Sequence, residues 1–542
     1  MSAPTSLPLR QAYLHPLCIA FIITYIVLSF AYRHEIPPDD ASYYLRTIFR
    51  GISLPFSLFN FECEGHPSWA YLLLLAIPQY VDLGNFELMV LFNAALGATS
   101  IIIFYRLLLR LFRDTAFTAT ECAILAGIYA LSPGLLVHTI FINADFGVLI
   151  FFLPTLYCLL IERFWLAALG ACGMIFSKET GIAIYLLLGS AYYITFILRT
   201  YPRLGETRSS LWRFAPFSLP LFCASAYAVA HFWLRPETPL VHTSTQNITP
   251  LSFIFNFDLY SRMLQKILGV LFIINFTWLL WLPGLLLISY ALWKRIRGIR
   301  SREVNTKTMR ISVFFSLLVI GMVYLLTRYR FAVTLRYFLC FPPLLLIALG
   351  AILLGLPITR KIRVSYLTTT LILIFISNFR CIDPLAMNVL GTFQFGTRYF
   401  LTISPAHAQT NSLVYNYEYF DLLGLYAAAL KDLQPEKGTV FFTASPNPLD
   451  GMARLNSSTY ERTLRPKEDS IFFQHIEVSR LPNILSKPTS AFFIDSPNLG
   501  NQDETIRAIM KDYQFDWFRT FQYRGLSLKV IHFTLKANPQ LP

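Results

Sequence analysis

Acidic residues gather in the stretch 33–69, which separates two strongly apolar regions of the chain. Asp39 and Asp40 directly follow Pro37 and Pro38, and proline holds the backbone before them extended, so both carboxylates should emerge at a membrane surface. A carboxylate in that place could exchange a proton with a substrate hydroxyl. The alternative is an ordinary polar loop in which one of the two acids caps a helix that begins with Ser42.

A second group of candidate residues stands at the end of the same stretch. Glu62, Glu64 and His66 are spaced so that a carboxylate and an imidazole can approach one divalent ion or one phosphate. The alternative is that they are solvated loop residues; for Glu62 the two readings weigh the same, and for Glu64 and His66 the loop reading weighs less.

Two charged residues interrupt an otherwise continuous apolar region at Lys178 and Glu179. Charge between two membrane spans is expensive and usually marks a substrate or ion path, although a Lys/Glu pair can also simply cap two helix ends. Asp145 begins another apolar run, where a lone acid is more often a helix cap than a functional group.

Three arginines, Arg328, Arg330 and Arg336, occur in the segment TRYRFAVTLRYF. If the N-terminus and the other basic clusters lie inside, these arginines lie outside, on the side of the membrane that is normally poor in positive charge. Such arginines need an anionic partner, and the phosphate of a lipid fits that need.

The composition is that of a polytopic membrane protein. Of the 542 residues 55% are hydrophobic and 14% charged, and the mean hydropathy is +0.51. The net charge of +14 falls in short clusters between apolar runs, which excludes a nucleic-acid protein and instead encodes orientation in a bilayer. The eight cysteines form neither a CxxC motif nor a zinc spacing.

About eleven apolar runs reach the ~20-residue length of a membrane span. They are 14–32, 86–105, 119–137, 145–161, 164–177, 180–198, 214–234, 268–293, 311–327, 337–356 and 363–379. The run 67–81 is shorter and contains Pro78, so it is predicted to lie along the interface. Five basic clusters, at 106–113, 163, 199–213, 294–302 and 360–363, then fall on the side of the N-terminus, which places the loops 33–85 and 235–266, the turns at 138–145 and 178–179, and the tail after Asn378 outside.

Residues 381–542 differ in character from the apolar domain 1–380. Aliphatic spans stop, and strand-like runs at 439–444, 490–495 and 526–535 alternate with helical patterns at 418–432 and 503–513. We expect a small soluble α/β domain on the outer face.

Four segments together resemble the GT-C superfamily of glycosyltransferases that use polyprenyl-phosphate sugars. They are PDDASYY (38–44), GHPSWAYLL (65–73), SKETG (177–181) and LRYFLCFPPLLL (335–346). The resemblance covers roughly residues 10–380 by order and topology. Ser68 replaces a usual proline and Asp40 stands where many relatives have glutamate, but neither change removes a charge.

The resemblance implies inverting transfer of a sugar at the outer face of a membrane, in a bacterium the periplasmic face of the inner membrane. Asp39, with Asp40 beside it, matches the catalytic acid-base position. Lys178, Arg336 and Arg330 would bind the donor phosphate. The residues that would contact the acceptor or a metal are Glu64, His66, Asp145 and Glu179. No cofactor is required, although a divalent ion is compatible with this set. The donor, the bilayer and a lipid, glycan or protein acceptor are the expected partners.

Two other functions remain open from the sequence. A transporter or flippase for lipid-linked glycans would also carry charges among its spans, but the acids here lie in an outer loop and the chain has no inverted repeat. A non-enzymatic assembly protein whose outer domain binds a partner is the third reading.

Overall fold

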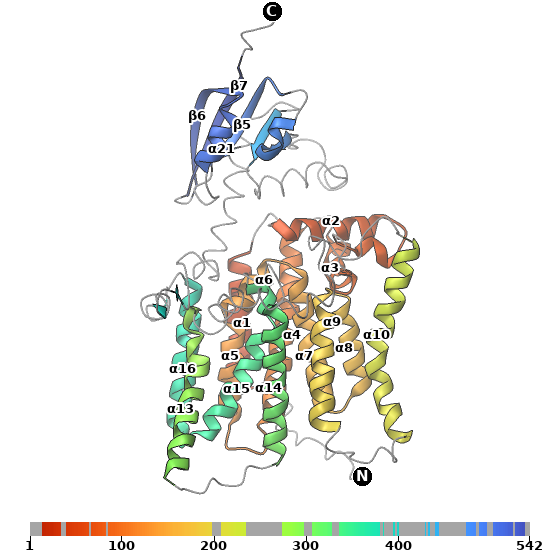
Figure 1. Cartoon of the computed structure of the whole chain (residues 1–542), viewed down its shortest axis with the longest axis vertical. Coiled ribbons are helices and arrows are strands. Elements are labelled where there is room, and N and C mark those ends of the chain that lie inside the picture. Colours follow the sequence, from red (N-terminus) through yellow and green to blue (C-terminus); the bar gives the residue numbers. More distant parts are fainter. Residues whose placement is uncertain are drawn as a thin grey trace, which may run out of the picture. The chain divides into compact units, whose positions relative to one another are not determined.

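The computed structural model is mainly helical, with a small sheet near the C-terminus (Figure 1). It divides into two compact units: residues 1–33, 56–77 and 89–415 form the first, and residues 34–55, 78–88 and 416–542 the second. The residues that the structure describes are 13–33, 39–63, 67–82, 85–197, 208–234, 274–297, 306–327, 335–379, 383, 394–395, 398–399, 429, 432–433, 439–443, 473–483, 487–495, 502–523 and 526–536.

The helices of the first unit follow the apolar runs of the sequence. They are α1 (Pro16–Ala31), α3 (Trp69–Val81), α4 (Phe86–Leu111), α5 (Ala119–Ala130), α6 (Pro133–Ile140), α7 (Ala144–Leu160), α8 (Phe164–Ile175), α9 (Thr180–Tyr192), α10 (Arg208–Leu234), α13 (Trp278–Ile296), α14 (Thr306–Thr327), α15 (Phe341–Gly355) and α16 (Arg360–Ile376). Short helical turns η2 (Leu58–Phe61), η3 (Tyr193–Ile197), η6 (Ile274–Phe276), η7 (Leu335–Phe338) and η8 (Ser377–Phe379) join or extend them, and a two-stranded ladder pairs β1 (Gln394–Phe395) with β2 (Arg398–Tyr399). The first residues of α4 and the last of α3 are assigned to the second unit.

The helices of the first unit pack in a continuous series. Helix α8 contacts α7, α9 and α10, while α14 joins α9 to α15. Helix α15 in turn packs on α13 and α5, and α5 contacts α1 and α16 (Figure 1). The interior between them is apolar, with fully buried large side chains such as Phe104, Phe152 and Phe314.

Three of the described helices, α4, residues Pro216–Leu234 of α10 and residues Arg360–Phe379, are long and apolar enough to cross a membrane. The bent pair α5 and α6 adds a fourth if it counts as one span. The other apolar helices in the described ranges are shorter, so the number of eleven spans and the interfacial position of α3 remain predictions.

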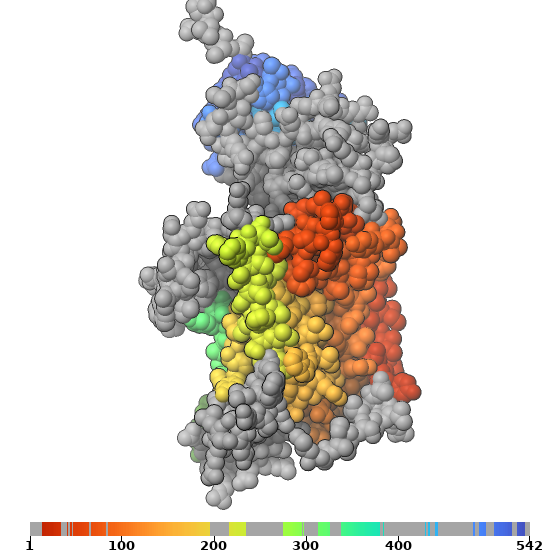
Figure 2. Space-filling model, turned by 90° about the vertical axis from the view of Figure 1, so that its right-hand side faces the viewer, coloured from red at the N-terminus to blue at the C-terminus, as the bar shows by residue number. Residues whose placement is uncertain are grey.

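Helix α10 shows what the outside of this bundle is made of. Phe222, Val229, Phe232 and Trp233 are all more than half exposed along it, and the helix stands out on one face of the molecule (Figure 2). A contiguous apolar face of this kind suits contact with lipid rather than water.

The predicted single run 119–137 is two helices. Helices α5 and α6 meet at an angle of 48°, because Pro133 starts a new helix and cannot continue the hydrogen-bond ladder of the old one. The Leu131 carbonyl accepts a hydrogen bond of 2.9 Å from Asn378 Nδ2. A polar group freed inside an apolar environment is thereby satisfied.

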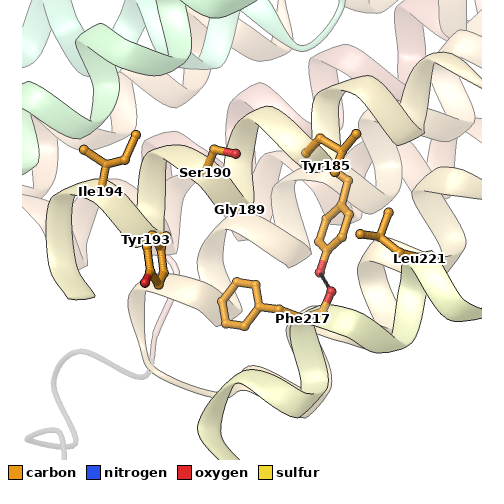
Figure 3. A pocket seen from close by; sticks show the side chains of 8 residues that line it. Tyr185, Gly189, Ser190, Tyr193, Ile194, Phe217 and Leu221 are labelled. Carbon is orange, nitrogen blue, oxygen red and sulfur yellow. Dashed lines mark hydrogen bonds between the residues drawn. The ribbon is translucent and has the colours of Figure 1, made fainter. Parts of the chain in front are cut away.

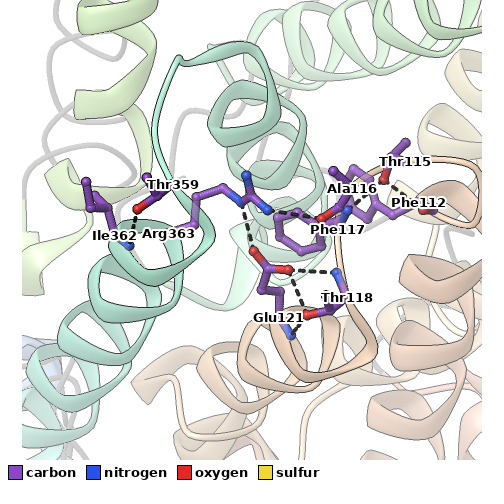
Figure 4. Close-up of polar contacts among 9 residues, drawn as sticks. All are labelled: Phe112, Thr115, Ala116, Phe117, Thr118, Glu121, Thr359, Ile362 and Arg363. Carbon is purple, nitrogen blue, oxygen red and sulfur yellow. Dashed lines mark hydrogen bonds and ion pairs between the residues drawn. The ribbon is translucent and has the colours of Figure 1, made fainter.

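A buried ion pair lies at the start of α5 (Figure 4). Arg363 Nε of α16 donates to Glu121 Oε1 at 2.8 Å, and another guanidinium nitrogen donates to the Ala116 carbonyl at 3.0 Å. The second Glu121 oxygen accepts from both the amide and the hydroxyl of Thr118, each at 2.7 Å, which forms a capping box. The pair ties α16 to α5.

The second unit contains α2 (Asp39–Ser53) and a five-stranded sheet in the order β4-β3-β5-β7-β6. The sheet is formed by β3 (Thr439–Thr443), β4 (Phe473–Glu477), β5 (Ser490–Asp495), β6 (Tyr513–Tyr523) and β7 (Leu526–Leu535), with η10 (Val478–Asn483) and α21 (Gln502–Ile509) beside it. The first three strands are parallel, and β7 pairs antiparallel with both β5 and β6.

The α/β prediction for the C-terminal region is confirmed in its strands 439–444, 490–495 and 526–535. Strand β6 was not predicted, although aromatic and polar residues alternate over its first five positions, YQFDW. Phe442, Phe493, Tyr513 and Phe533 form the core of the sheet. The domain boundary at 380 remains a prediction, and most of the helical pattern 418–432 lies outside the described residues.

Candidate functional site

Lys178 and Asp145 form a buried ion pair at the junction of three helices. Lys178 lies in the turn between α8 and α9, and its Nζ donates to Asp145 Oδ2 in the first turn of α7 at 2.8 Å. The two side chains are only 9% and 8% exposed. When two charges are buried, the solvation free energy they lose can exceed the free energy of their attraction. A buried ion pair is therefore not explained by stability alone, and a functional role has to be considered.

The sequence SKETG fixes the turn that carries Lys178. The Lys178 carbonyl accepts from the Gly181 amide at 2.9 Å, and Ser177 Oγ donates to the Gly173 carbonyl at 2.7 Å. A Cβ at position 181 would overlap the backbone carbonyl of Met174, so only glycine allows this close approach.

Asn143 and His138 lie next to this pair along the chain, where α6 ends and α7 begins. Asn143 is the N-cap of α7, because its Oδ1 accepts from the Phe146 amide at 3.0 Å. Its Nδ2 is 2.7 Å from the Phe141 carbonyl and 3.0 Å from His138 Nδ1. His138 itself is 6% exposed.

Arg336 is brought to the same place by η7. This turn packs against both α6, which carries His138, and α7, which carries Asp145. The structure therefore pairs Lys178 with Asp145 and packs the turn that carries Arg336 against the helix of Asp145.

A second polar cluster joins the first loop to α10. Glu62, 8% exposed, accepts a short hydrogen bond from the Tyr227 hydroxyl through Oε1. Its Oε2 lies 3.3 Å from His231 Nε2. Phe59 stacks on Tyr227 at 5.4 Å between ring centroids.

Phe176 connects this cluster to the turn of Lys178. Its ring meets Tyr227 edge-on at 5.4 Å and stacks on Trp69 at 4.6 Å, both between centroids. Its carbonyl accepts from the Ala70 amide at 2.9 Å. Since Phe176 stands two residues before Lys178, Glu62 is held near the ion pair and is not a solvated loop residue.

Five other predicted site residues lie wholly or partly outside the described part of the structure. Asp39 and Asp40 are the first residues of α2, but their side chains lie outside the described part of the structure. Glu64, His66 and Arg330 lie outside it altogether. Their predicted roles therefore stay predictions.

Glu179 is half-buried at the N-cap position of α9, where its side chain makes no capping hydrogen bond. The described residues contain no group of three or more His, Cys, Asp or Glu side chains placed to hold a metal ion. The predicted metal site of Glu64 and His66 is outside that range and stays a prediction.

Four residues of the two clusters were not predicted: His138, Asn143, Tyr227 and His231. Each lies inside or beside an apolar run, where a histidine or tyrosine usually packs as a core residue. A weak signal existed for Asn143, because Asn before an apolar run is a common helix cap.

A separate apolar pocket of 380 Å³ lies between α9, η3 and α10 (Figure 3). Tyr185, Ser190, Tyr193 and Phe217 line it among aliphatic side chains. The Tyr185 hydroxyl donates a hydrogen bond to the Phe217 carbonyl at 2.6 Å, so this polar group of the pocket is already bonded within the protein. It has the character of a hydrocarbon site and holds none of the predicted site residues.

No protein-family model and no curated protein matches this chain. Among solved structures it is similar to ArnT from Cupriavidus metallidurans bound to undecaprenyl phosphate, with 15% identity, a TM-score of 0.48, and coverage of 95% of this chain and 97% of that one. The structure of the same protein in the apo state has 14% identity to this chain and a TM-score of 0.45, and the match covers 95% of this chain and 97% of that one. Likeness at this level assigns no role to any residue here, so the chemistry is argued from the chain's own side chains.

Proposed function

We propose that this chain is an inverting glycosyltransferase that moves a sugar from a polyprenyl-phosphate donor to a lipid, glycan or protein acceptor. The observation that carries the proposal is the buried Lys178–Asp145 pair, with the turn η7 that carries Arg336 packed against α7, the helix of Asp145. Two cations at one end of an apolar bundle suit a ligand that is both hydrophobic and anionic.

The physical argument concerns the leaving group. When a glycosyl phosphate bond breaks, negative charge builds up on the departing phosphate, and preorganised cations in a water-poor site stabilise it strongly. Lys178 is held by Asp145, so its ammonium group is already in place before the ligand arrives. Arg336 adds a planar set of donors that matches phosphate oxygens.

The reaction requires a base as well as the cations. In the proposed step the acceptor hydroxyl oxygen bonds to the anomeric carbon, the bond from that carbon to the phosphate oxygen breaks, and the hydroxyl proton passes to the Asp39 carboxylate. Attack from the face opposite the leaving group inverts the anomeric centre. Asp39 takes this role from the sequence resemblance, with Asp40 beside it.

The cluster of Glu62, Tyr227 and His231 supports a role for the first loop in binding the acceptor. It fixes the segment just before Glu64 and His66 to α10. Those two residues would then orient the acceptor or hold a divalent ion, and Glu179 would line the same site. We place this chemistry at the outer face of a bacterial inner membrane, on the topology predicted from the basic clusters.

The test separates binding from chemistry in purified variants, using a polyprenyl-phosphate sugar. Asp39→Asn should lower single-turnover transfer by about 10²–10⁴-fold while donor affinity stays nearly unchanged. Lys178→Ala and Arg336→Ala should weaken donor binding, because their contact to phosphate exists before the sugar moves.

Asp82→Asn is the matched control for Asp39→Asn, since Asp82 is an exposed acid whose carboxylate accepts from Asn85. The control should transfer sugar like the unmodified protein. If Asp39→Asn abolishes donor binding while Lys178→Ala and Arg336→Ala bind normally, the division of roles is wrong. If the unmodified protein neither binds nor transfers the sugar, a transporter or an assembly protein becomes the better reading.

A further inference from the structure

The inference begins with a buried nitrogen that has no partner. His138 Nε2 is excluded from solvent and makes no hydrogen bond with the rest of the described chain. Buried polar atoms are nearly always satisfied, and an exception in a native fold often marks a place where something binds.

The protonation of the His138 ring follows from its neighbour. Because Asn143 Oδ1 accepts the helix-capping bond from the Phe146 amide, the other end of that amide group must be the NH₂. Its two hydrogens point to the Phe141 carbonyl and to His138 Nδ1. His138 Nδ1 is therefore an acceptor without a proton, and the ring's proton sits on Nε2.

The ring is also neutral. It is buried, so a second proton would place a positive charge away from water, and Nδ1, the atom that would carry it, is already used as an acceptor. A neutral imidazole with this tautomer presents one donor, the Nε2–H group, and no free acceptor.

The surrounding hydrogen bonds hold the ring in place. The neighbouring Thr139 bonds to the Tyr25 hydroxyl through its side chain at 2.5 Å, and its carbonyl accepts from Asn93 Nδ2 at 2.7 Å. Asn93 Oδ1 in turn accepts from the Tyr71 hydroxyl at 2.8 Å. Helices α1, α3 and α4 thus fix the end of α6, which makes relaxation of His138 toward another partner costly.

We propose that His138 Nε2–H donates a hydrogen bond to a phosphate oxygen of the ligand bound by Arg336 and Lys178. The proposal rests on the proposed function and adds a neutral donor to its two cations. His138 would bind the phosphate as a neutral hydrogen-bond donor, alongside the two cations.

The experiment measures binding of three probes to the purified protein: a polyprenyl phosphate, the corresponding polyprenol and inorganic phosphate. His138→Leu removes the donor, whereas His138→Gln places an amide NH₂ close to the position of Nε2. His532→Leu is the control, since that histidine pairs with Asp516 in the sheet of the second unit.

His138→Leu should weaken polyprenyl phosphate binding by about 10–100-fold, the loss expected for a hydrogen bond to a charged group. His138→Gln should recover most of this loss, and His532→Leu should bind like the unmodified protein. Polyprenol binding should be equal in all variants. If His138→Leu loses binding of inorganic phosphate, the site recognises the phosphate group alone. If inorganic phosphate binds neither to the unmodified protein nor to the variant, the site also needs the lipid chain. Both outcomes support the assignment.

A second readout is independent of affinity. In protein labelled with nitrogen-15 histidine, the signal that His138→Gln removes should show a proton on Nε2 and none on Nδ1, and it should shift when polyprenyl phosphate is added. A folded His138→Leu variant that binds polyprenyl phosphate normally would overturn the assignment but leave the proposed function standing. Failure of the unmodified protein to bind any polyprenyl phosphate would overturn both.

Discussion

The first unit contains two buried ion pairs, Glu121–Arg363 and Lys178–Asp145, that have similar geometry but different surroundings. Glu121 and Arg363 are fully enclosed by protein partners, because the carboxylate serves the capping box of α5 and the guanidinium also reaches the Ala116 carbonyl (Figure 4). Lys178 and Asp145 instead lie at a turn and a helix start, close to Arg336 and to a histidine with an unused donor.

The comparison teaches how to separate a structural pair from a functional one. Burial and distance do not distinguish them, since both pairs are below 10% exposed and both bonds measure 2.8 Å. What differs is the neighbourhood: the Glu121 pair also bonds the Thr118 side chain and the Ala116 carbonyl, whereas the chain next to Asp145 carries a buried histidine nitrogen, His138 Nε2, without a hydrogen-bond partner.

The largest effect is expected on stability at the Glu121 pair. Arg363→Met alone leaves a buried carboxylate without its partner and should lower the free energy of unfolding by about 3–5 kcal/mol. Adding Glu121→Gln removes the charge but keeps a side chain that can accept the Thr118 bonds, so the double variant should recover most of that loss. Thermal unfolding in detergent measures both. A double variant as unstable as the single one would contradict this account.

Next in size is the matched experiment on function. The double variant Lys178→Met with Asp145→Asn should fold, yet lose about 10²–10³-fold in sugar transfer, because the cation is the useful part of that pair. The double variant Arg363→Met with Glu121→Gln should transfer within about threefold of the unmodified protein, a difference of under 1 kcal/mol. Equal losses in the two would erase the distinction between the pairs.

Tyr227→Phe tests the second cluster with a smaller expected effect. It removes one hydrogen bond to a buried carboxylate, a loss of about 1.5–3 kcal/mol, and keeps the ring that stacks on Phe59. Hydrogen exchange of the segment 58–63 should speed up accordingly. Tyr185→Phe is the control, since its hydroxyl bonds a carbonyl at the apolar pocket and should leave that segment unchanged.

The smallest effect is expected for Arg336→Lys. Lysine keeps the charge but loses the planar array of donors, so polyprenyl phosphate binding should weaken by about 2–10-fold, less than for Arg336→Ala. A titration of both variants decides this. Identical affinities for the two would mean that a positive charge alone contributes nothing at this position and that the planar donor array accounts for the whole effect.

The sequence predicted the helices well because length and apolar content alone define them: run 145–161 became α7 (Ala144–Leu160) and run 363–379 became α16. It also found Lys178, Asp145 and Arg336, since charge is conspicuous beside apolar sequence. It could not pair Glu62 with Tyr227, which is 165 positions away, because tertiary contacts leave no local pattern. His138 was overlooked for the same reason, as its role depends on the orientation of one neighbouring amide.

The bond between Asn378 and the Leu131 carbonyl has a consequence for how the protein is made. The two residues are 247 positions apart, and Asn378 lies at the end of the last predicted span. While the chain is being inserted, the bend between α5 and α6 must wait for this partner, with its carbonyl satisfied by water or by the insertion machinery. The end of α6, and with it His138, therefore reaches its final arrangement only after synthesis of the whole bundle, so a truncated precursor carries every early motif without an assembled site.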